Sequence, residues 1–368
     1  MRYVKTSEIE VGDRFAKTIY NKDGVLLFNS GVKVDNFMKE KLQSLNLYGT
    51  YILDAAEPVP PITETELEFE RFQWTQTYVV NEILKEVLDH KMPQKLPKLV
   101  DVIYTRFGEE NKKMIFNQCL RGENDFISKH SLNVAILANI IAKKMNMDEK
   151  EIKYLIQAAL FHDIGRLLVP NQILHKEGQL ERHEMDIVHQ CLLDGFEEIG
   201  LNYQYPAGVR RYIIQLSLDL SNRLPNQPKN ELKLLPGTKI IQVADIYDTL
   251  TAIRCYKPPL SPFSALKIME SEPDKYDART VDALTDCIHI LPAGAYVMLS
   301  NGEQGIVVSE NNRKIDRPVV LGMRSNNLYD LSQRSVYEEV QILDTVFTPD
   351  NRQQVEMDVS KYKKQDRK

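Results

Sequence analysis

Three apolar helical patterns in the middle of the chain each carry a histidine or an aspartate among residues that belong in a core. In the string FISKHSLNVAILANIIAKKM, His130 falls in the same three- and four-residue series as Val134 and Leu137, which predicts a side chain directed into the interior. A second apolar stripe ends at the adjacent pair His162 and Asp163. The patterns therefore predict a helical block whose core holds ionisable groups.

The sequence also marks the ends of the second helix and adds a third one. Asp148 followed by Glu151 predicts a capping box at the start of the second helix, and Gly165 follows the His-Asp pair as a helix-ending residue. The third helix, KIIQVADIYDTLTAI, carries Asp245 and Asp248 inside an otherwise apolar run. Imidazole or carboxylate groups thus come from three separate helices.

Buried groups of this kind need partners, and together they make a ligand set. Imidazole nitrogens and carboxylate oxygens suit a divalent Zn, Mn or Fe ion, and a charged carboxylate in a helical core needs a cation or a hydrogen-bonding partner. Four side chains are candidate metal ligands that leave positions open for water: His130, His162, Asp163 and Asp245. The alternative is a scaffold in which all four are buried polar residues, because a single histidine on an apolar face is most often a satisfied core residue.

The composition limits the class of function. Of the 368 residues, 43% are hydrophobic and 27% are charged, which is typical of a globular rather than a disordered chain. The net charge of -5 carries no footprint of a nucleic-acid-binding protein. No apolar run approaches the roughly 18 residues of a membrane span, and the first residues lack the apolar region of a secretory signal. The four cysteines form no C-x-x-C pair, so we expect a cytoplasmic protein without a disulfide scaffold.

Changes in pattern divide the chain into five parts. Residues 1–56 are expected to form a mixed α/β accessory domain, because short strand patterns and turn residues flank a helical pattern. Residues 57–98 are expected to form a proline-marked linker and a charged helical stalk, with an ordinary packed helix as the alternative. An all-helical block covers 99–288, a β-rich appendage 289–346 and a flexible tail 347–368. The predicted fold class is mainly α, with small β-containing units at both ends.

The strings around the candidate ligands resemble one family. HSLNVAILA, HDIGRLLVPNQILHKEGQL and VADIYDTLTAIRCYKPPLSPFSAL are similar to the HD-GYP branch of the HD phosphohydrolase superfamily. That branch contains bacterial cyclic-di-GMP phosphodiesterases. The resemblance implies that the helical block is an HD-GYP-like domain, that the four candidate ligands hold a divalent metal, and that the two end units are accessories common in the family.

The sequence departs from the family at several ligand positions. A family His-Pro-x-x-Gly element corresponds to CLLDG, which puts its ligand position at Cys191, with His189 two residues earlier. Either residue is a candidate additional ligand, although an inert core cysteine is the simpler interpretation. A glutamate that binds a third metal in the family corresponds to Phe126, and a lysine after the His-Asp pair corresponds to Arg166. Arginine can still clamp a phosphate, but it is a poor proton donor.

A larger departure precedes the third helix. The paired histidines of the family correspond to Leu216 and Ser217, and its Gly-Tyr-Pro tripeptide corresponds to residues 224–226. No histidine occurs between residues 189 and 289, so these ligands for a second metal are absent whatever the alignment. The resemblance therefore implies a reduced site with one divalent ion.

This reduced site leads to two functional hypotheses. We expect a metal-dependent phosphoric ester hydrolase of cyclic-di-GMP signalling that acts on cyclic-di-GMP or another phosphate ester, with Asp163 and Arg166 as catalytic residues. Arg166 and His175 are expected to bind the substrate, and Asp248 to line the substrate site or to support the ligands from behind. The alternative is a catalytically inactive cyclic-di-GMP receptor or a regulator that binds other proteins. A homodimer or a regulatory protein stays open as a partner.

Overall fold

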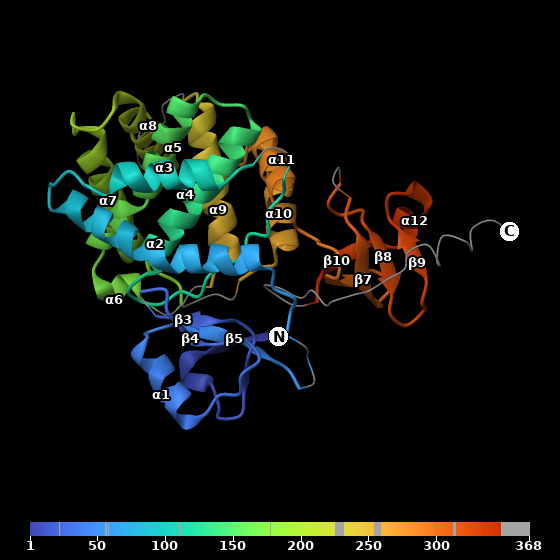
Figure 1. The fold of residues 1–368 in the computed structure, drawn as a ribbon. Coiled ribbons are helices and arrows are strands. Elements are labelled where there is room, and N and C mark those ends of the chain that lie inside the picture. Colours follow the sequence, from blue (N-terminus) through green and yellow to red (C-terminus); the bar gives the residue numbers. More distant parts are fainter. Residues whose placement is uncertain are drawn as a thin grey trace.

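The computed structural model describes residues 1–21, 23–55, 57, 59–109, 112–176, 178–224, 232–253, 259–311 and 314–346. Helices predominate in this part of the chain and the strands form small antiparallel sheets, which confirms the predicted mainly α fold with β-containing ends. Figure 1 shows the helical block, with one sheet unit beneath it and another at its side. The predicted tail lies outside the described residues, and the predicted domain boundaries stay a prediction.

The N-terminal unit is built from short strands around one helix. Its elements are β1 (Arg2–Lys5), β2 (Arg14–Phe15), β3 (Ile19–Tyr20), β4 (Leu26–Phe28), α1 (Asn36–Ser44) and β5 (Gly49–Leu53). The strands pair in the orders β1-β5-β2 and β3-β4. Helix α1 begins where the Asp35 side chain accepts a hydrogen bond from the backbone N–H of Met38. The buried side chains of this unit form an apolar core of their own.

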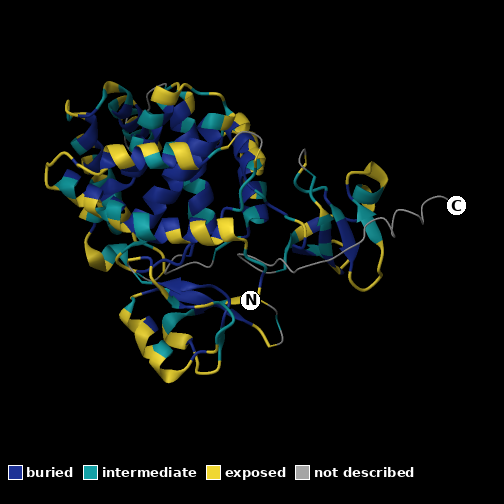
Figure 2. Cartoon of the chain, in the orientation of Figure 1, coloured by how far each residue is buried: buried dark blue, intermediate teal, exposed yellow. Residues whose placement is uncertain are grey.

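The helical block follows. Its elements are α2 (Glu64–Leu88), α3 (Leu96–Arg106), α4 (Phe126–Lys144), α5 (Glu149–Phe161), the short 3₁₀ turn η2 (Ile164–Leu168), α6 (Asn171–Leu174), α7 (Arg182–Gly200), α8 (Ala207–Arg223), α9 (Pro236–Thr251), α10 (Pro262–Ser271) and α11 (Ala278–Cys287). Helix α4 packs against α2, α5, α9 and α11 and is buried along nearly its whole length. Figure 2 shows buried residues in the interior of this block and exposed ones on its outer faces.

Helix α2 corrects the stalk interpretation of residues 57–98. The helix begins in a capping box between Thr63 and Glu66, and its residues Phe69, Phe72 and Ile83 lie in the apolar core of the helical block. It packs along α4 as an ordinary helix of the bundle. Charged residues on its outer face suit a helix with one side in water, so the high charge did not indicate a free-standing stalk.

A second correction concerns the start of α5. Asp148 caps the helix by accepting a hydrogen bond from the backbone N–H of Lys150. The reciprocal bond of the predicted capping box is replaced, because the Glu151 carboxylate instead accepts bonds from Arg211 at 2.7 Å and from the Tyr212 hydroxyl at 2.8 Å. Glu151 therefore joins α5 to α8 rather than closing its own helix end.

The C-terminal unit is an antiparallel sheet with one helix. It contains β6 (Tyr296–Leu299), β7 (Gln304–Ser309), β8 (Val319–Gly322), β9 (Leu328–Asp330), α12 (Arg334–Glu339) and β10 (Ile342–Thr345), and its strand order is β10-β6-β7-β8-β9. Val297, Val307 and Val320 of this sheet belong to the same apolar cluster as the helical block. Across the described residues, none of the helices combines the length and apolar character needed to cross a membrane.

Candidate metal centre

His130 lies in the interior because α4 is buried on every side. Its side chain is buried, with Nε2 3.1 Å from Oδ1 of Asp245 on α9 and Nδ1 2.6 Å from Oδ2 of Asp248 on the same helix. Asp245 and Asp248 are three residues apart and so lie on one face of α9. That face packs against α4, which brings both carboxylates to the two nitrogens of one imidazole.

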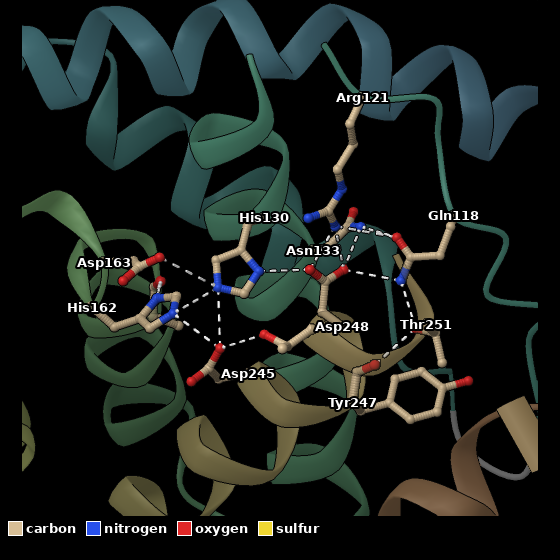
Figure 3. Close-up of polar contacts among 12 residues, drawn as sticks. Gln118, Arg121, His130, Asn133, His162, Asp163, Asp245, Tyr247, Asp248 and Thr251 are labelled. Carbon is tan, nitrogen blue, oxygen red and sulfur yellow. Dashed lines mark hydrogen bonds and ion pairs between the residues drawn. The ribbon is translucent and has the colours of Figure 1, made fainter. Parts of the chain in front are cut away.

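His162 is placed by the end of α5. It is the C-cap residue of that helix, and its Nδ1 lies 2.7 Å from the backbone carbonyl oxygen of Ala159, to which it donates a hydrogen bond. This bond leaves Nε2 facing inward, 3.2 Å from Nε2 of His130 and 3.8 Å from Oδ1 of Asp245. Figure 3 shows the two rings and the Asp245 carboxylate turned toward one another.

These three side chains meet the requirements of a metal site. One ligand atom each from His130, His162 and Asp245 lies within 4.8 Å of the others. Two imidazole nitrogens that both present lone pairs can face each other at 3.2 Å only with a proton or a cation between them. A nitrogen–nitrogen–oxygen set suits Zn, Mn or Fe, so the donor chemistry fits the predicted divalent ion.

Asp163, the fourth predicted ligand, lies at the edge of this group. Its carboxylate oxygen is 3.7 Å from Nε2 of His130 and forms an ion pair with the Arg166 guanidinium. Burial alone raises the pKa of Asp163, but the positive charges of Arg166, His162 and His130 outweigh burial and lower it. The group remains an anion beside the three converging ligands.

Asp248 lies behind His130. This position corrects the expectation that Asp248 lines the substrate site. Its carboxylate has no exposed surface. Arg121 donates to both oxygens at 2.7 and 2.5 Å, and the side-chain amides of Gln118 and Asn133 donate to Oδ1 at 3.0 and 2.8 Å. A carboxylate so enclosed cannot contact a substrate in this structure. It instead orients His130, which is the support that the sequence left open.

The pairs of charges shift the proton affinities of the site. Burial alone lowers the pKa of His130, but hydrogen bonds and charge interactions with Asp245 and Asp248 raise it above the ordinary value. Burial raises the pKa of each aspartate, yet hydrogen bonds from His130 and His162 hold the pKa of Asp245 well below its usual range, and Arg121 does the same for Asp248. Both carboxylates are therefore anions, Asp248 paired with Arg121 and Asp245 facing the two imidazoles.

The remaining predicted residues lie around this centre or away from it. Arg166 is partly exposed beside Asp163. His175 follows α6, with Nδ1 3.4 Å from the Tyr48 hydroxyl of the N-terminal unit and its ring against Phe126. Phe126 occupies the first position of α4, where the family has a metal-binding glutamate, and it offers no donor atom.

The two candidate additional ligands lie on α7. Neither His189 nor Cys191 belongs to a group of ligand atoms close enough to hold a metal in the part of the chain described here. Burial and the charge of Asp194 raise the pKa of the Cys191 thiol, which disfavours the thiolate form that metals bind. On α8, Leu216 is part of the apolar core, at a position where the family has histidine.

Sequence reasoning missed the hydrogen-bonding partners of Asp248. Arg121 and Gln118 come from an irregular segment before α4, where no periodicity indicates burial. Asn133 carries a usable signal, because it lies three residues after His130 on the same apolar helix and a buried amide requires partners.

Comparisons with known proteins agree with this geometry. A family described as HD domain matches residues 114–280. The chain is 25% identical over 207 residues to the cyclic di-GMP phosphodiesterase PA4108 of Pseudomonas aeruginosa, covering 55% of this chain and 49% of that protein. It is 29% identical over 197 residues to the 3'3'-cGAMP-specific phosphodiesterase 3 of Vibrio cholerae, covering 48% and 38%.

Two further similarities complete the comparison. The cyclic di-GMP phosphodiesterase response regulator RpfG of Xanthomonas campestris is 27% identical over 158 residues, which cover 40% of each chain. The solved structure of Bd1817, an HDG"Y"P protein from Bdellovibrio bacteriovorus, superimposes with a TM-score of 0.43 at 14% identity, covering 77% of this chain and 98% of that one. The chain spans about half or less of the length of the three relatives it matches by sequence.

A helical bundle that gathers two histidines and an aspartate agrees with the match to the HD domain, a family whose members depend on a metal. Residues 114–280 match the HD domain family, in agreement with the superfamily that the sequence motifs indicated. The relatives found are phosphodiesterases of cyclic dinucleotides, in keeping with the HD-GYP resemblance.

Proposed function

We propose that the protein is a metal-dependent phosphodiesterase that hydrolyses cyclic-di-GMP or a related cyclic dinucleotide. The observation that carries the proposal is the convergence of Nε2 of His130, Nε2 of His162 and a carboxylate oxygen of Asp245 from three separate elements. The names of the relatives, which include cyclic di-GMP and 3'3'-cGAMP phosphodiesterases, support the substrate class.

The proposed cofactor is one divalent ion, Fe, Mn or Zn. His130, His162 and Asp245 would hold it, with Asp163 as a fourth ligand. A bound divalent ion supplies a Lewis acid that polarises a phosphoryl oxygen and lowers the pKa of water. A single ion follows from the chain's own residues, since Leu216 and Ser217 on α8 replace the histidines expected for a second one.

The surrounding residues would orient the substrate. Arg166 presents a partly exposed guanidinium next to Asp163, and a planar guanidinium can bind two phosphate oxygens at once. His175 lies against Phe126, one helical turn before His130, so it is the second residue proposed to contact the substrate. Asp248 would hold the His130 ring in place from behind.

The second candidate function is a receptor that binds cyclic-di-GMP without hydrolysing it, or that binds a protein partner. The specific observation in its favour is the apolar surroundings of Leu216 in place of a metal ligand. Two metals stabilise both the attacking and the leaving oxygen of a phosphodiester, whereas one metal cannot do both equally well. A homodimer also stays a prediction.

Hydrolysis in the absence of oxygen is the test of the proposal. The full chain would be incubated with cyclic-di-GMP, and separately with 3'3'-cGAMP, in added manganese or ferrous iron, and the products separated by chromatography. Asp163→Ala and Asp245→Ala would be run alongside, with the exposed α7 variant Asp186→Ala as the matched control.

Linear dinucleotide or mononucleotide formed by the wild type and by Asp186→Ala, but not by the two ligand-site variants, would support the phosphodiesterase. Nucleotide binding by calorimetry with no product from either substrate would contradict it and favour the receptor. If the chain neither binds the nucleotides nor forms product, both nucleotide functions are contradicted.

A further inference from the structure

A short segment before α4 lies between the N-terminal unit and the metal centre. It covers residues 117–122, with sequence NQCLRG, and we call it the linking segment. Its residues lie outside the regular helices and strands, yet they are buried. One side of this segment faces the N-terminal unit and the other faces α9.

On its outer side, the backbone of the linking segment pairs with the N-terminal unit. The backbone N–H of Tyr48 donates to the carbonyl of Arg121 at 3.0 Å, and the N–H of Glu123 donates to the carbonyl of Asn46 at 3.1 Å. A side chain at Gly122 would place its Cβ 2.3 Å from the Asn46 carbonyl oxygen, so this close pairing requires glycine.

A buried ion pair fixes the same contact. The Lys17 ammonium of the N-terminal unit donates to the carbonyl of Gln118 at 2.8 Å and pairs with Glu70 of α2 at 3.2 Å. All three groups are buried. Leu120 of the linking segment also belongs to the apolar core of the N-terminal unit. Because a buried charge is costly to leave without its partners, the segment is held in one position.

On its inner side, the linking segment supports the metal centre. Arg121 and Gln118 direct their side chains to the carboxylate of Asp248, and that carboxylate accepts a hydrogen bond from the Nδ1–H group of His130 (Figure 3). The partner of Nδ1 decides which imidazole nitrogen keeps its lone pair, so these bonds leave Nε2 of His130 available on the side of His162.

We propose that the N-terminal unit is a structural part of the metal centre. It acts through Arg121, which is a positioning residue for His130. The unit fixes the backbone of the linking segment, Arg121 fixes Asp248, and Asp248 fixes the His130 ring and its tautomer. The inference rests on the proposed function only in treating His130 as a ligand. Removal of such a supporting group typically costs about 10–100-fold in metal affinity.

The first experiment changes Arg121 in the full chain. Arg121→Met removes the guanidinium, and Arg121→Lys keeps a charge without the planar fork. Two quantities would be measured: the ring-nitrogen NMR signals of His130 in the metal-free protein at alkaline pH, where the imidazole is neutral, and the affinity and absorption spectrum of added Co²⁺. The lysine variant carries the same test if the methionine variant does not fold.

The wild type is expected to show one His130 tautomer, with the proton on Nδ1, and the Arg121 variants a mixture of both. Co²⁺ affinity is expected to fall by about 10–100-fold. An unchanged tautomer together with unchanged Co²⁺ affinity in a folded Arg121 variant would overturn the proposal. Because the NMR signal needs neither metal nor substrate, it decides this inference even if the wild type proves inactive or binds no Co²⁺.

The second experiment tests the contribution of the N-terminal unit. Lys17→Met removes the buried contact to the linking segment, and Lys41→Met removes an exposed lysine of α1 as the matched control. Lys17→Met is expected to shift the His130 signals and to lower Co²⁺ affinity in the same direction as the Arg121 variants. If Lys17→Met behaves like Lys41→Met in both measurements, the N-terminal unit is not part of the metal centre.

Discussion

His130 and His162 each use one ring nitrogen for a hydrogen bond and turn the other toward the metal centre. Nδ1 of His162 donates to the carbonyl of Ala159, and Nδ1 of His130 donates to Asp248. Both Nε2 atoms therefore face the site, where a metal would replace any proton that they carry. At the residue scale, the hydrogen bonds behind the rings favour a metal site over a scaffold of buried polar groups.

The raised pKa of His130 predicts how metal binding depends on pH. Burial alone would lower this pKa, but the bonds to Asp245 and Asp248 raise it above the ordinary 6.5. A proton and a metal compete for the same Nε2, so metal affinity should fall as pH decreases through the raised pKa, by about tenfold per unit of pH below it. Calorimetric titration of Mn²⁺ at pH 6, 7 and 8 would measure this, and equal affinity across the range would contradict it.

The raised pKa of His130 affects the folding stability of the metal-free protein in the opposite direction to metal binding. A histidine whose pKa is raised by folding stabilises the folded state below its unfolded pKa of about 6.5, and this contribution is lost as pH rises through the raised value. Metal binding and metal-free stability should therefore change in opposite directions across neutral pH.

Asp248 offers a second prediction at this scale. Asp248→Asn leaves the buried Arg121 guanidinium without a charged partner, and breaking a buried pair in this way costs about 3–5 kcal/mol. Urea unfolding of the metal-free chain would measure the loss, with the exposed Asp186→Asn on α7 as the control. A loss below about 1 kcal/mol would show that the pair contributes little.

At the scale of elements, the turn η2 and helix α7 approach unusually closely. A Cβ at Gly165 would lie 2.1 Å from the carbonyl oxygen of Cys191, and one at Gly195 would lie 2.5 Å from the backbone nitrogen of Gly165. Gly165 therefore does not end α5, which stops at Phe161, but lets α7 pack against the turn that follows His162. This packing positions the His-Asp pair.

Gly195→Ala tests that close packing. The added methyl would push α7 away from η2, and overpacking of this kind costs about 1–3 kcal/mol. We also expect weaker Co²⁺ binding, because the turn follows directly on His162 and Asp163. Thermal unfolding and Co²⁺ titration would be compared with Asp186→Ala on the same helix, and stability and affinity equal to that control would contradict the role of the glycine pair.

At the scale of the whole molecule, the two sheet units join the helical block differently. The C-terminal sheet shares one apolar cluster with the helices, whereas the N-terminal unit has a separate core. Trp74 of α2, Leu120 and Ile253 belong to that separate core, so three segments of the helical block complete it. The N-terminal unit is thus docked on the helical block (Figure 1), and it contacts the segment that carries Arg121, which supports His130 through Asp248.

The sequence predicted the features that depend on local patterns, namely the helices and the polar residues within them. Apolar periodicity located α4, α5 and α9, and the polar residues within it identified His130, His162 and Asp245. It could not locate Arg121, because its partner Asp248 is 127 residues away and the segment around it has no period. Nor could it place His175, whose contact with Tyr48 depends on how two units pack.

The metal content of the purified chain tests the central claim most directly. Protein prepared without chelators would be analysed by mass spectrometry of its metals, together with Asp245→Ala and the control Asp186→Ala. The account predicts about one divalent ion per chain in the wild type and the control, and its loss from Asp245→Ala. A metal-free wild type after incubation with Mn²⁺, Fe²⁺ and Zn²⁺, or equal metal content in Asp245→Ala, would contradict it.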